Sequence, residues 1–264
     1  MGVKKHIILY RYFLIKNLRE SMSYKLDFLM GVSAHIARQT VGILFLSIIY
    51  TNTPALNGWT YHQSLMLYGF ALIPAGLDEF FLRNIWTLPN KYVRMGNLDR
   101  LLLRPINPLY AITVDGTNLH GFILSIYGII VCVYSGIELN LVFTPMTFLW
   151  ILVLIICATS IYFSITILMA TFSFWFIDVM SSMVLIESLN QFLKYPLAIY
   201  PYALQILLTW IIPYAFTSYF PVEFILGGSL AAYAYITPVI ALLLLFIASR
   251  FFVFGLKRYS SAGG

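Results

Sequence analysis

The chain has 264 residues, of which 61% are hydrophobic, 17% aromatic and only 10% charged, and its mean hydropathy is +0.86. A soluble domain of this length would carry roughly a quarter charged residues, so the composition excludes an ordinary soluble protein and indicates one surrounded by lipid. The net charge of +6 does not indicate nucleic-acid binding, because no basic run carries interleaved aromatic residues on a soluble surface.

Five apolar runs are long enough to cross a bilayer, which takes about 20 helical residues. In chain order they lie at 28–50, 64–86, 113–135, 147–174 and 230–254. The runs lack the alternation of polar and apolar residues that membrane β-strands show. We therefore predict an all-α integral membrane protein with a single transmembrane domain over the whole chain, 1–264.

The basic residues predict how the chain is oriented. They gather before the first run, between the second and third runs, and after the last run, whereas the loop TNTPALNGWTYHQ has no charge. By the positive-inside rule, both termini and the 83–112 loop face the cytoplasm. The expected location is the cell membrane (plasma or inner), crossed several times.

The stretch 179–226 is long enough for two crossings, but this orientation leaves room for only one. Hydropathy favours 203–226 as the crossing, because 179–200 is interrupted by charged and amide side chains. Pro213 and Pro221 favour instead a broken, re-entrant hairpin over 203–226 that neighbouring helices must shield. From the residues alone, both assignments remain open.

Four stretches carry a resemblance to a known family. They are, in chain order, SYKLDFLMG, GNLDRLLLRPINPLY, KYPLAIYPYALQILLTWIIPYAFTSYFP and GLKRYSSAGG. Their order and spacing are similar to those of the permease subunits of type-2 ABC exporters, in the branch of the daunorubicin-resistance and viologen-export permeases. The resemblance implies six transmembrane helices, an N-terminal interfacial elbow helix over 1–27, and a cytoplasmic coupling helix between spans two and three. It also implies that 179–200 is span five and that 203–226 is a re-entrant extracellular hairpin between spans five and six.

The same resemblance implies that the chain forms the substrate pathway of an ATP-driven exporter, as a dimer with a second permease copy or a paralogue. The sequence itself contains no G-x-x-x-x-G-K-[ST] loop and no metal-ligand spacing among its histidines. We therefore expect a catalytically silent subunit without a cofactor, coupled to a cytosolic ABC ATPase dimer that binds ATP and Mg²⁺. The alternative is a stand-alone channel or an intramembrane scaffold without ATP coupling.

The stretch GNLDRLLLRPINP predicts a short amphipathic helix in the 83–112 loop. Asn97 or Asp99 is suited to cap it, Pro105 to end it, and two arginines four residues apart share one face. Such a helix either docks on a soluble partner or lies at anionic lipid headgroups, and the resemblance favours docking on the ATPase. The predicted coupling residues are Gly96, Asn97, Asp99, Arg100, Leu101, Arg104 and Pro105.

Polar residues in 179–200 recur at the spacing i, i+3, i+4, i+7, which places them on one helical stripe. They are Glu187, Asn190, Gln191 and Lys194. Ionisable groups inside a membrane usually face a cavity or a partner, so this stripe is the predicted substrate pathway at a dimer interface. Two alternatives remain: a structural ion pair between Glu187 and Lys194, and a segment that lies at the membrane surface.

Two other groups of residues are candidates for a role in transport. The aromatic residues Tyr214, Phe216, Tyr219 and Phe220 are a predicted outer gate, although an aromatic belt at the outer membrane interface explains most residues of this cluster without a substrate. In the first apolar run, Arg38 is expected to extend toward the inner headgroups. Drugs, peptides and lipids would all fit a pathway with so few charges.

Overall fold

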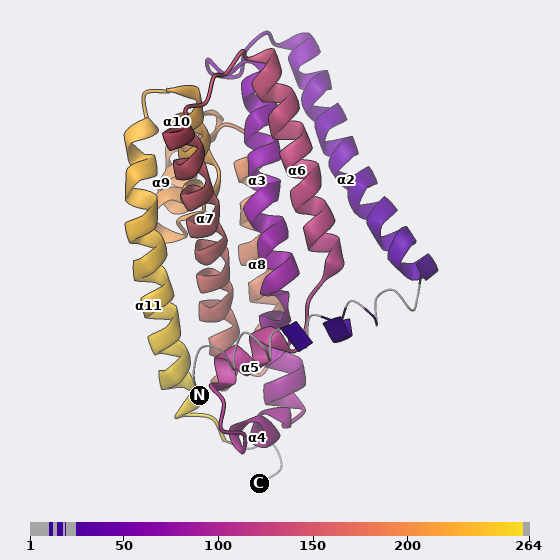
Figure 1. The fold of residues 1–264 in the computed structure, drawn as a ribbon. Helices are drawn as coiled ribbons and strands as arrows, with labels where there is room; N and C mark the ends of the chain where they lie inside the picture. Colours follow the sequence, from indigo (N-terminus) through magenta and orange to yellow (C-terminus); the bar gives the residue numbers. More distant parts are fainter. Residues whose placement is uncertain (1–10, 13–14, 18, 20–24, 261–264) are drawn as a thin grey trace.

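The computed structural model describes residues 11–12, 15–17, 19 and 25–260. Within these residues the protein is built from helices and contains no β-strand (Figure 1). Five helices are long and apolar enough to cross a membrane, which confirms the predicted all-α membrane protein. The long helices are α2 (Lys25–Asn52), α3 (Tyr61–Phe81), α6 (Leu119–Glu138), α7 (Pro145–Thr171) and α11 (Thr237–Leu256).

The predicted third run, 113–135, starts too early. Residues 108–114 form a separate helix, α5 (Pro108–Val114), and α6 begins only at Leu119. The reason is local capping: the side chain of Asn118 accepts a hydrogen bond from the backbone N–H of His120 at 3.1 Å, which starts a new helix there.

Helices α3 and α6 are the closest-packed pair of the bundle, because glycines let their backbones approach. A Cβ atom on Gly76 would lie 2.5 Å from the carbonyl oxygen of Gly121, and one on Gly121 would lie 2.5 Å from that of Gly76. Farther along, a Cβ on Gly128 would lie 2.6 Å from the carbonyl oxygen of Gly69. Lipid supplies no hydrophobic driving force between helices, so small residues at such a crossing stabilise the pair by allowing close van der Waals packing.

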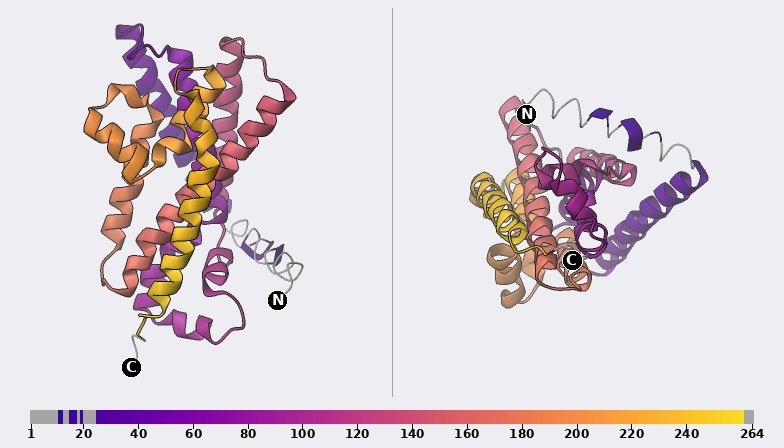
Figure 2. Two further views of the ribbon diagram at one scale, coloured as in Figure 1. Left: turned by 90° about the vertical axis from the view of Figure 1, so that its left-hand side faces the viewer. Right: turned by 90° about the horizontal axis from the view of Figure 1, so that it is seen from below.

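One end of the bundle carries the short helices that follow α3 (Figure 1). They are η1 (Arg83–Thr87), η2 (Leu88–Arg94), α4 (Asn97–Leu102) and α5. Helix α2 leans away from the rest of the bundle toward this end, as the view from below also shows (Figure 2). We call this the α4 end.

The segment between α7 and α11 is broken into short helices. Helix α8 (Met180–Leu189) and η4 (Asn190–Lys194) rise from the α4 end and cover roughly 22 Å at 1.5 Å per residue, less than the ~30 Å of a bilayer core. The chain then forms a hairpin at the opposite end (Figure 2). Its pieces are η5 (Leu197–Ile199), α9 (Tyr202–Ile206), η6 (Leu207–Ile211), η7 (Tyr214–Thr217), α10 (Tyr219–Leu226) and η8 (Ala231–Ile236).

The count of six spans therefore stays a prediction, since 180–194 is too short to cross alone. The predicted elbow over 1–27 falls mostly outside the described residues. Of those described there, 11–12, 15–17 and 19 are helical, and 25–27 begin α2.

The α3–α6 crossing gives a direct stability test. Gly121→Ala should lower the free energy of unfolding by about 1–3 kcal/mol, because its methyl group meets the backbone of α3. The matched control is Gly136→Ala on the same helix, where the nearest atom to an added Cβ is Met66 Cε at 3.6 Å. Thermal unfolding in detergent should separate the two variants, and equal midpoints would contradict close backbone packing at Gly121.

Candidate functional site

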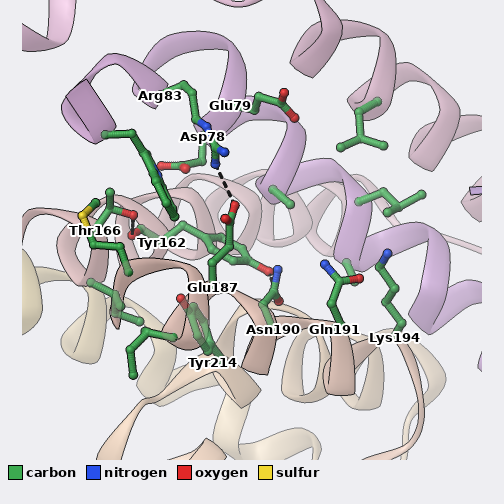
Figure 3. Close-up of a pocket in the computed structure, with 18 of the residues that line it drawn as sticks. Asp78, Glu79, Arg83, Tyr162, Thr166, Glu187, Asn190, Gln191, Lys194 and Tyr214 are labelled. Atoms are coloured by element: carbon green, nitrogen blue, oxygen red, sulfur yellow. Dashed lines mark hydrogen bonds and ion pairs between the residues drawn. The ribbon is translucent and has the colours of Figure 1, made fainter. Parts of the chain in front are cut away.

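A polar cavity of about 90 Å³ lies where α2, α3, α7 and α8 meet (Figure 3). It continues into a cleft of about 890 Å³ between α2 and α8. Charged and amide side chains line both spaces, in a part of the bundle whose helices are otherwise apolar. The residues common to both linings are Arg38, Gln39, Glu79, Arg83, Glu187, Gln191 and Lys194.

An ion pair joins the two walls of the cavity. Arg83 Nη1 donates to Glu187 Oε1 at 2.7 Å, although the two residues are 104 positions apart in the chain. Figure 3 shows the arginine reaching across to the α8 carboxylate. The guanidinium also lies 4.2 Å from the ring centroid of Trp86, which fixes its orientation. Glu187 therefore pairs with Arg83, and the alternative pairing with Lys194 is wrong.

The other residues of the predicted polar stripe also face the cavity or the cleft. Asn190 is buried and accepts a hydrogen bond from the Tyr162 hydroxyl on α7. Gln191 lines the cavity and the cleft. Lys194 donates to Gln39 Oε1 at 3.1 Å. The structure thus brings all four residues to one polar space, as the helical spacing predicts.

The sequence interpretation missed Asp78, which also lines the cavity. Its side chain is only 8% exposed, and its Oδ1 has no hydrogen-bond partner among the described residues. A carboxylic acid within an apolar run was the available signal, since such groups are rare in membranes without a role.

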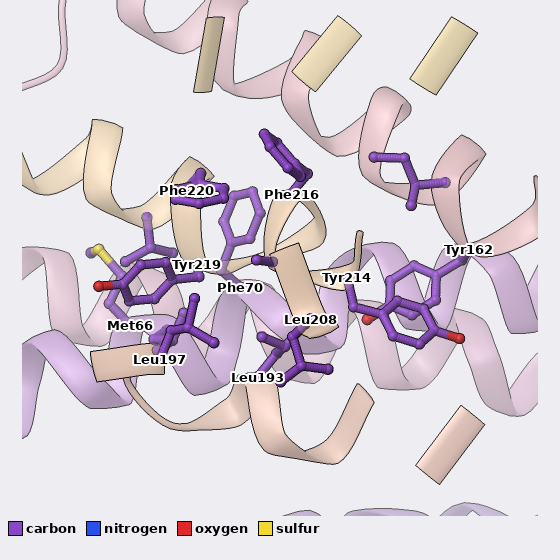
Figure 4. Packing of buried hydrophobic residues seen from close by; sticks show 14 of the residues in the cluster. Met66, Phe70, Tyr162, Leu193, Leu197, Leu208, Tyr214, Phe216, Tyr219 and Phe220 are labelled. Atoms are coloured by element: carbon purple, nitrogen blue, oxygen red, sulfur yellow. The ribbon is translucent and has the colours of Figure 1, made fainter. Parts of the chain in front are cut away.

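The four predicted gate residues are all buried (Figure 4). Tyr214 closes one side of the cavity and packs against Tyr162 with ring centroids 5.4 Å apart. Phe216, Tyr219 and Phe220 lie in the apolar core of the hairpin, where Phe216 and Phe220 have centroids 4.6 Å apart. They do not face lipid, so the belt interpretation is wrong for these four.

Helix α4 begins differently from the prediction. Its N-cap position is Gly96, whose φ of 69° is left-handed, and neither Asn97 nor Asp99 caps it. Glycine adopts this conformation without strain, so the chain turns directly from η2 into α4. The Asn97 amide instead donates to the carbonyl oxygen of Lys91 at 2.8 Å. The helix ends at Leu102, just before Pro105.

The leucines of α4 divide between the protein interior and the surface. Leu98 and Leu101 are buried, so the predicted coupling residue Leu101 is an internal anchor. Leu103 is 87% exposed, and Met95 is 73% exposed. Arg100 and Arg104 are exposed beside them. The α4 end thus presents large apolar side chains next to two guanidinium groups.

The anchors of α4 belong to an apolar cluster that reaches into the long helices. It joins α4 to α7, α8 and α11, so α4 and the lower half of the bundle form one packed body. The buried members are Ile85, Leu88, Tyr92, Leu98, Leu101, Ile112, Ile167, Ala170, Val179, Met183, Ala248 and Phe252.

Asp115 ties η2 to α5. Lys91 Nζ donates to its Oδ2 at 2.7 Å and the Tyr92 hydroxyl donates to the same oxygen at 2.8 Å. Burial by itself would raise the pKa of Asp115, but these two donors outweigh it and hold that pKa below its usual range. Burial likewise opposes the charge of Lys91, yet Asp115 keeps the pKa of Lys91 above its usual value.

Comparison with known proteins identifies the family. A family model described as ABC-2 family transporter protein matches residues 36–263. The chain belongs to the ABC-2 transporter family. The predicted type-2 ABC permease is thereby confirmed, and with it a multi-pass membrane protein. No curated protein and no solved structure matches the chain.

In this permease, the ion pair across the cavity predicts energetic coupling. Arg83→Gln and Glu187→Gln should each destabilise the protein, while the double variant should lose less than the sum, with a coupling of about 0.5–3 kcal/mol. A control cycle combines Glu187→Gln with Arg94→Gln in place of Arg83→Gln. Arg94 is an exposed cation of η2. Denaturant unfolding should give additive effects for Arg94 and Glu187; additivity for Arg83 and Glu187 as well would refute the pair.

The stabilisation that Asp115 provides by binding Lys91 and Tyr92 depends on pH. Because its folded pKa lies below the unfolded value of about 3.9, its stabilisation is complete above that value and is lost as the pH falls through the folded pKa. Asp115→Asn should therefore speed amide exchange of residues 88–97 roughly fivefold at pH 7, as expected for about 1 kcal/mol. Exchange corrected for intrinsic rates should begin to converge with wild type as the pH falls below about 4 and should coincide with it once the pH lies below the folded pKa of Asp115. A difference that persists below that folded pKa would contradict the assignment.

Proposed function

We propose that this permease is the transmembrane subunit of an ATP-driven exporter, and that a cytosolic ABC ATPase dimer docks on α4. ATP and Mg²⁺ are bound by those ATPase subunits, and the permease itself carries no catalytic residue or cofactor. A second permease copy, or a paralogue, completes the substrate pathway.

One observation carries this proposal. Helix α4 and the turn that follows it present the exposed Leu102 and Leu103 beside the exposed Arg100 and Arg104, while the opposite face of α4 packs into the core. Apolar side chains with a basic rim suit a groove on a soluble partner that carries carboxylates. A helix that rested on lipid would not need rigid attachment to α7, α8 and α11 to do so.

The packing supports a route from α4 to the cavity. Leu98 and Leu101 pack in the same cluster as Met183 of α8. Glu187 lies one helical turn beyond Met183 on that helix. On the other side, η1 follows α3 directly and contributes Arg83, the partner of Glu187. A displacement of α4 by an ATPase is thus coupled to both cavity walls.

The distribution of charge supports a cytoplasmic α4 end. Exposed basic residues gather there, on η2, on α4 and after α11, as the positive-inside rule requires. They are Lys91, Arg94, Arg100, Arg104, Lys257 and Arg258. In this orientation both termini are cytoplasmic, and the predicted hairpin over 203–226 lies on the outer side.

The hairpin's construction supports its assignment as a re-entrant element between spans five and six. Its buried Glu223 accepts a hydrogen bond from the backbone N–H of Leu230 at 3.2 Å, which satisfies the turn after α10. Backbone that is not in a long helix must be shielded by protein at membrane depth, and the aromatic core around Phe216 provides that shield. The placement of the whole permease in the daunorubicin-resistance and viologen-export branch rests on sequence resemblance.

The docking proposal is tested by purification from the native membrane in mild detergent, with ATPase activity assayed in the eluate. Wild type should bring down a nucleotide-hydrolysing subunit in stoichiometric amount. Arg100→Glu/Arg104→Glu should lose at least tenfold of the co-purified activity, because both cations at the α4 surface are reversed.

Lys257→Glu/Arg258→Glu is the matched control, since it reverses two exposed cations at the same end that follow α11 and do not belong to α4. It should retain the ATPase. Retention by the α4 variant, or absence of any nucleotide-binding partner from intact wild type, would overturn docking on α4 and favour a channel or scaffold.

A further inference from the structure

Two basic residues of the described part of the chain lie between the ends of the helical bundle. They are Arg38 and Lys194, and they line the same cleft as Arg83. Arg38 is near the middle of the 28-residue helix α2, and Lys194 ends η4. Both side chains line the 890 Å³ cleft between α2 and α8.

Neither cation has a carboxylate partner within the described part of the chain. Ion pairs in that part of the chain include Arg83–Glu187 and Lys91–Asp115. Lys194 is held by neutral groups: it donates to Gln39 Oε1 and lies 5.1 Å from the ring centroid of Tyr68. Arg38 is exposed and lines the same cleft.

The cleft lining carries three cations, Arg38, Arg83 and Lys194, against two carboxylates, Glu79 and Glu187, and an excess of positive charge at this depth is costly in a membrane. An anion from outside the chain would balance that excess. The two possible sources are an acidic side chain of a second copy and a negatively charged ligand.

The chain's own acids are not free to serve a second copy at this depth. Glu187 is engaged by Arg83, Glu79 accepts from Asn118 Nδ2 at 3.0 Å, and Asp78 and Glu223 are buried. The remaining described acids lie at the helix ends or in the connecting segments; they are Asp27, Asp99, Asp115, Glu138 and Asp178. A ligand is therefore the better source of negative charge.

The cleft also has apolar walls. Val41 and Phe45 of α2 and Val184 of α8 line it, and all three are exposed. A cleft lined by cations and by exposed apolar side chains matches a molecule with an anionic head and an apolar tail. Arginine in particular binds phosphate through two parallel hydrogen bonds.

We propose that this cleft binds a membrane-borne amphiphile with a negatively charged, phosphate-type headgroup, which Arg38 and Lys194 hold. The inference rests on the proposed function, because it names the class of cargo that the exporter takes from the membrane. Binding of the amphiphile needs no ATPase, so its test is independent of the docking experiment.

The test is native mass spectrometry of the purified full-length permease in detergent, titrated with phosphatidylglycerol or phosphatidylcholine. Wild type should bind phosphatidylglycerol at least tenfold more tightly than phosphatidylcholine. Arg38→Gln/Lys194→Gln should lose that preference, whereas the control Lys257→Gln/Arg258→Gln should keep it. The charge-retaining Arg38→Lys should keep most of it, and the exposed single variant Arg38→Gln supplies the loss-of-charge test if the double variant does not fold.

Three results would overturn the proposal. One is an equal preference for phosphatidylglycerol in wild type and in the folded Arg38→Gln variant. Another is displacement of the lipid by millimolar inorganic phosphate, which would identify a site for the free anion. The third is a dimer in wild type that becomes a monomer in the Arg38→Gln variant with lipid retention unchanged, which would assign the cations to an interface between copies.

Discussion

The ion pair between Arg83 and Glu187 connects the α4 end of this permease to its polar cavity. Arg83 belongs to the short helices at the α4 end, and Glu187 belongs to α8, which forms a wall of the polar cavity. In a lipid environment such a pair has few competing partners, and breaking it leaves a charge that the surroundings solvate poorly. Any motion of the α4 end relative to α8 must either carry the pair along or break it.

The rest of the bundle provides a rigid frame for that connection. The glycine crossing of α3 and α6 holds these two helices at backbone contact, so α3 cannot easily slide as η1 moves. The buried cluster around Leu98 and Met183 packs α4 against α7, α8 and α11. By contrast, α2 leans away and leaves the cleft open on one side (Figure 2). The architecture thus combines a packed body with a more loosely attached helix beside its polar space.

Sequence alone predicts what depends on composition and short spacing. Apolar runs locate the long helices, and the spacing of Glu187 to Lys194 correctly places four polar residues on one side of a helix, because helical geometry is local. Gly96 is different: a left-handed N-cap is a backbone property that competes with the side-chain caps offered by Asn97 and Asp99. The pairing of Glu187 with Arg83 depends on tertiary packing between residues 104 positions apart, which local spacing does not specify. Burial of Leu101, but not Leu103, likewise depends on which way α4 faces, which a three-leucine run does not specify.

Coupling of α4 to the cavity is tested most directly by the distance between spin labels on the two walls of the cleft. Labels would be placed at Val41→Cys and Val184→Cys, after Cys132 and Cys157, the free cysteines of the described residues, are replaced by serine. In a complex with the ATPase, adding ATP should shift the distance distribution between α2 and α8 in an otherwise wild-type background. The shift should disappear in Arg83→Gln. A distribution that ATP leaves unchanged, or a shift that persists without Arg83, would contradict coupling of α4 to the cavity through this ion pair.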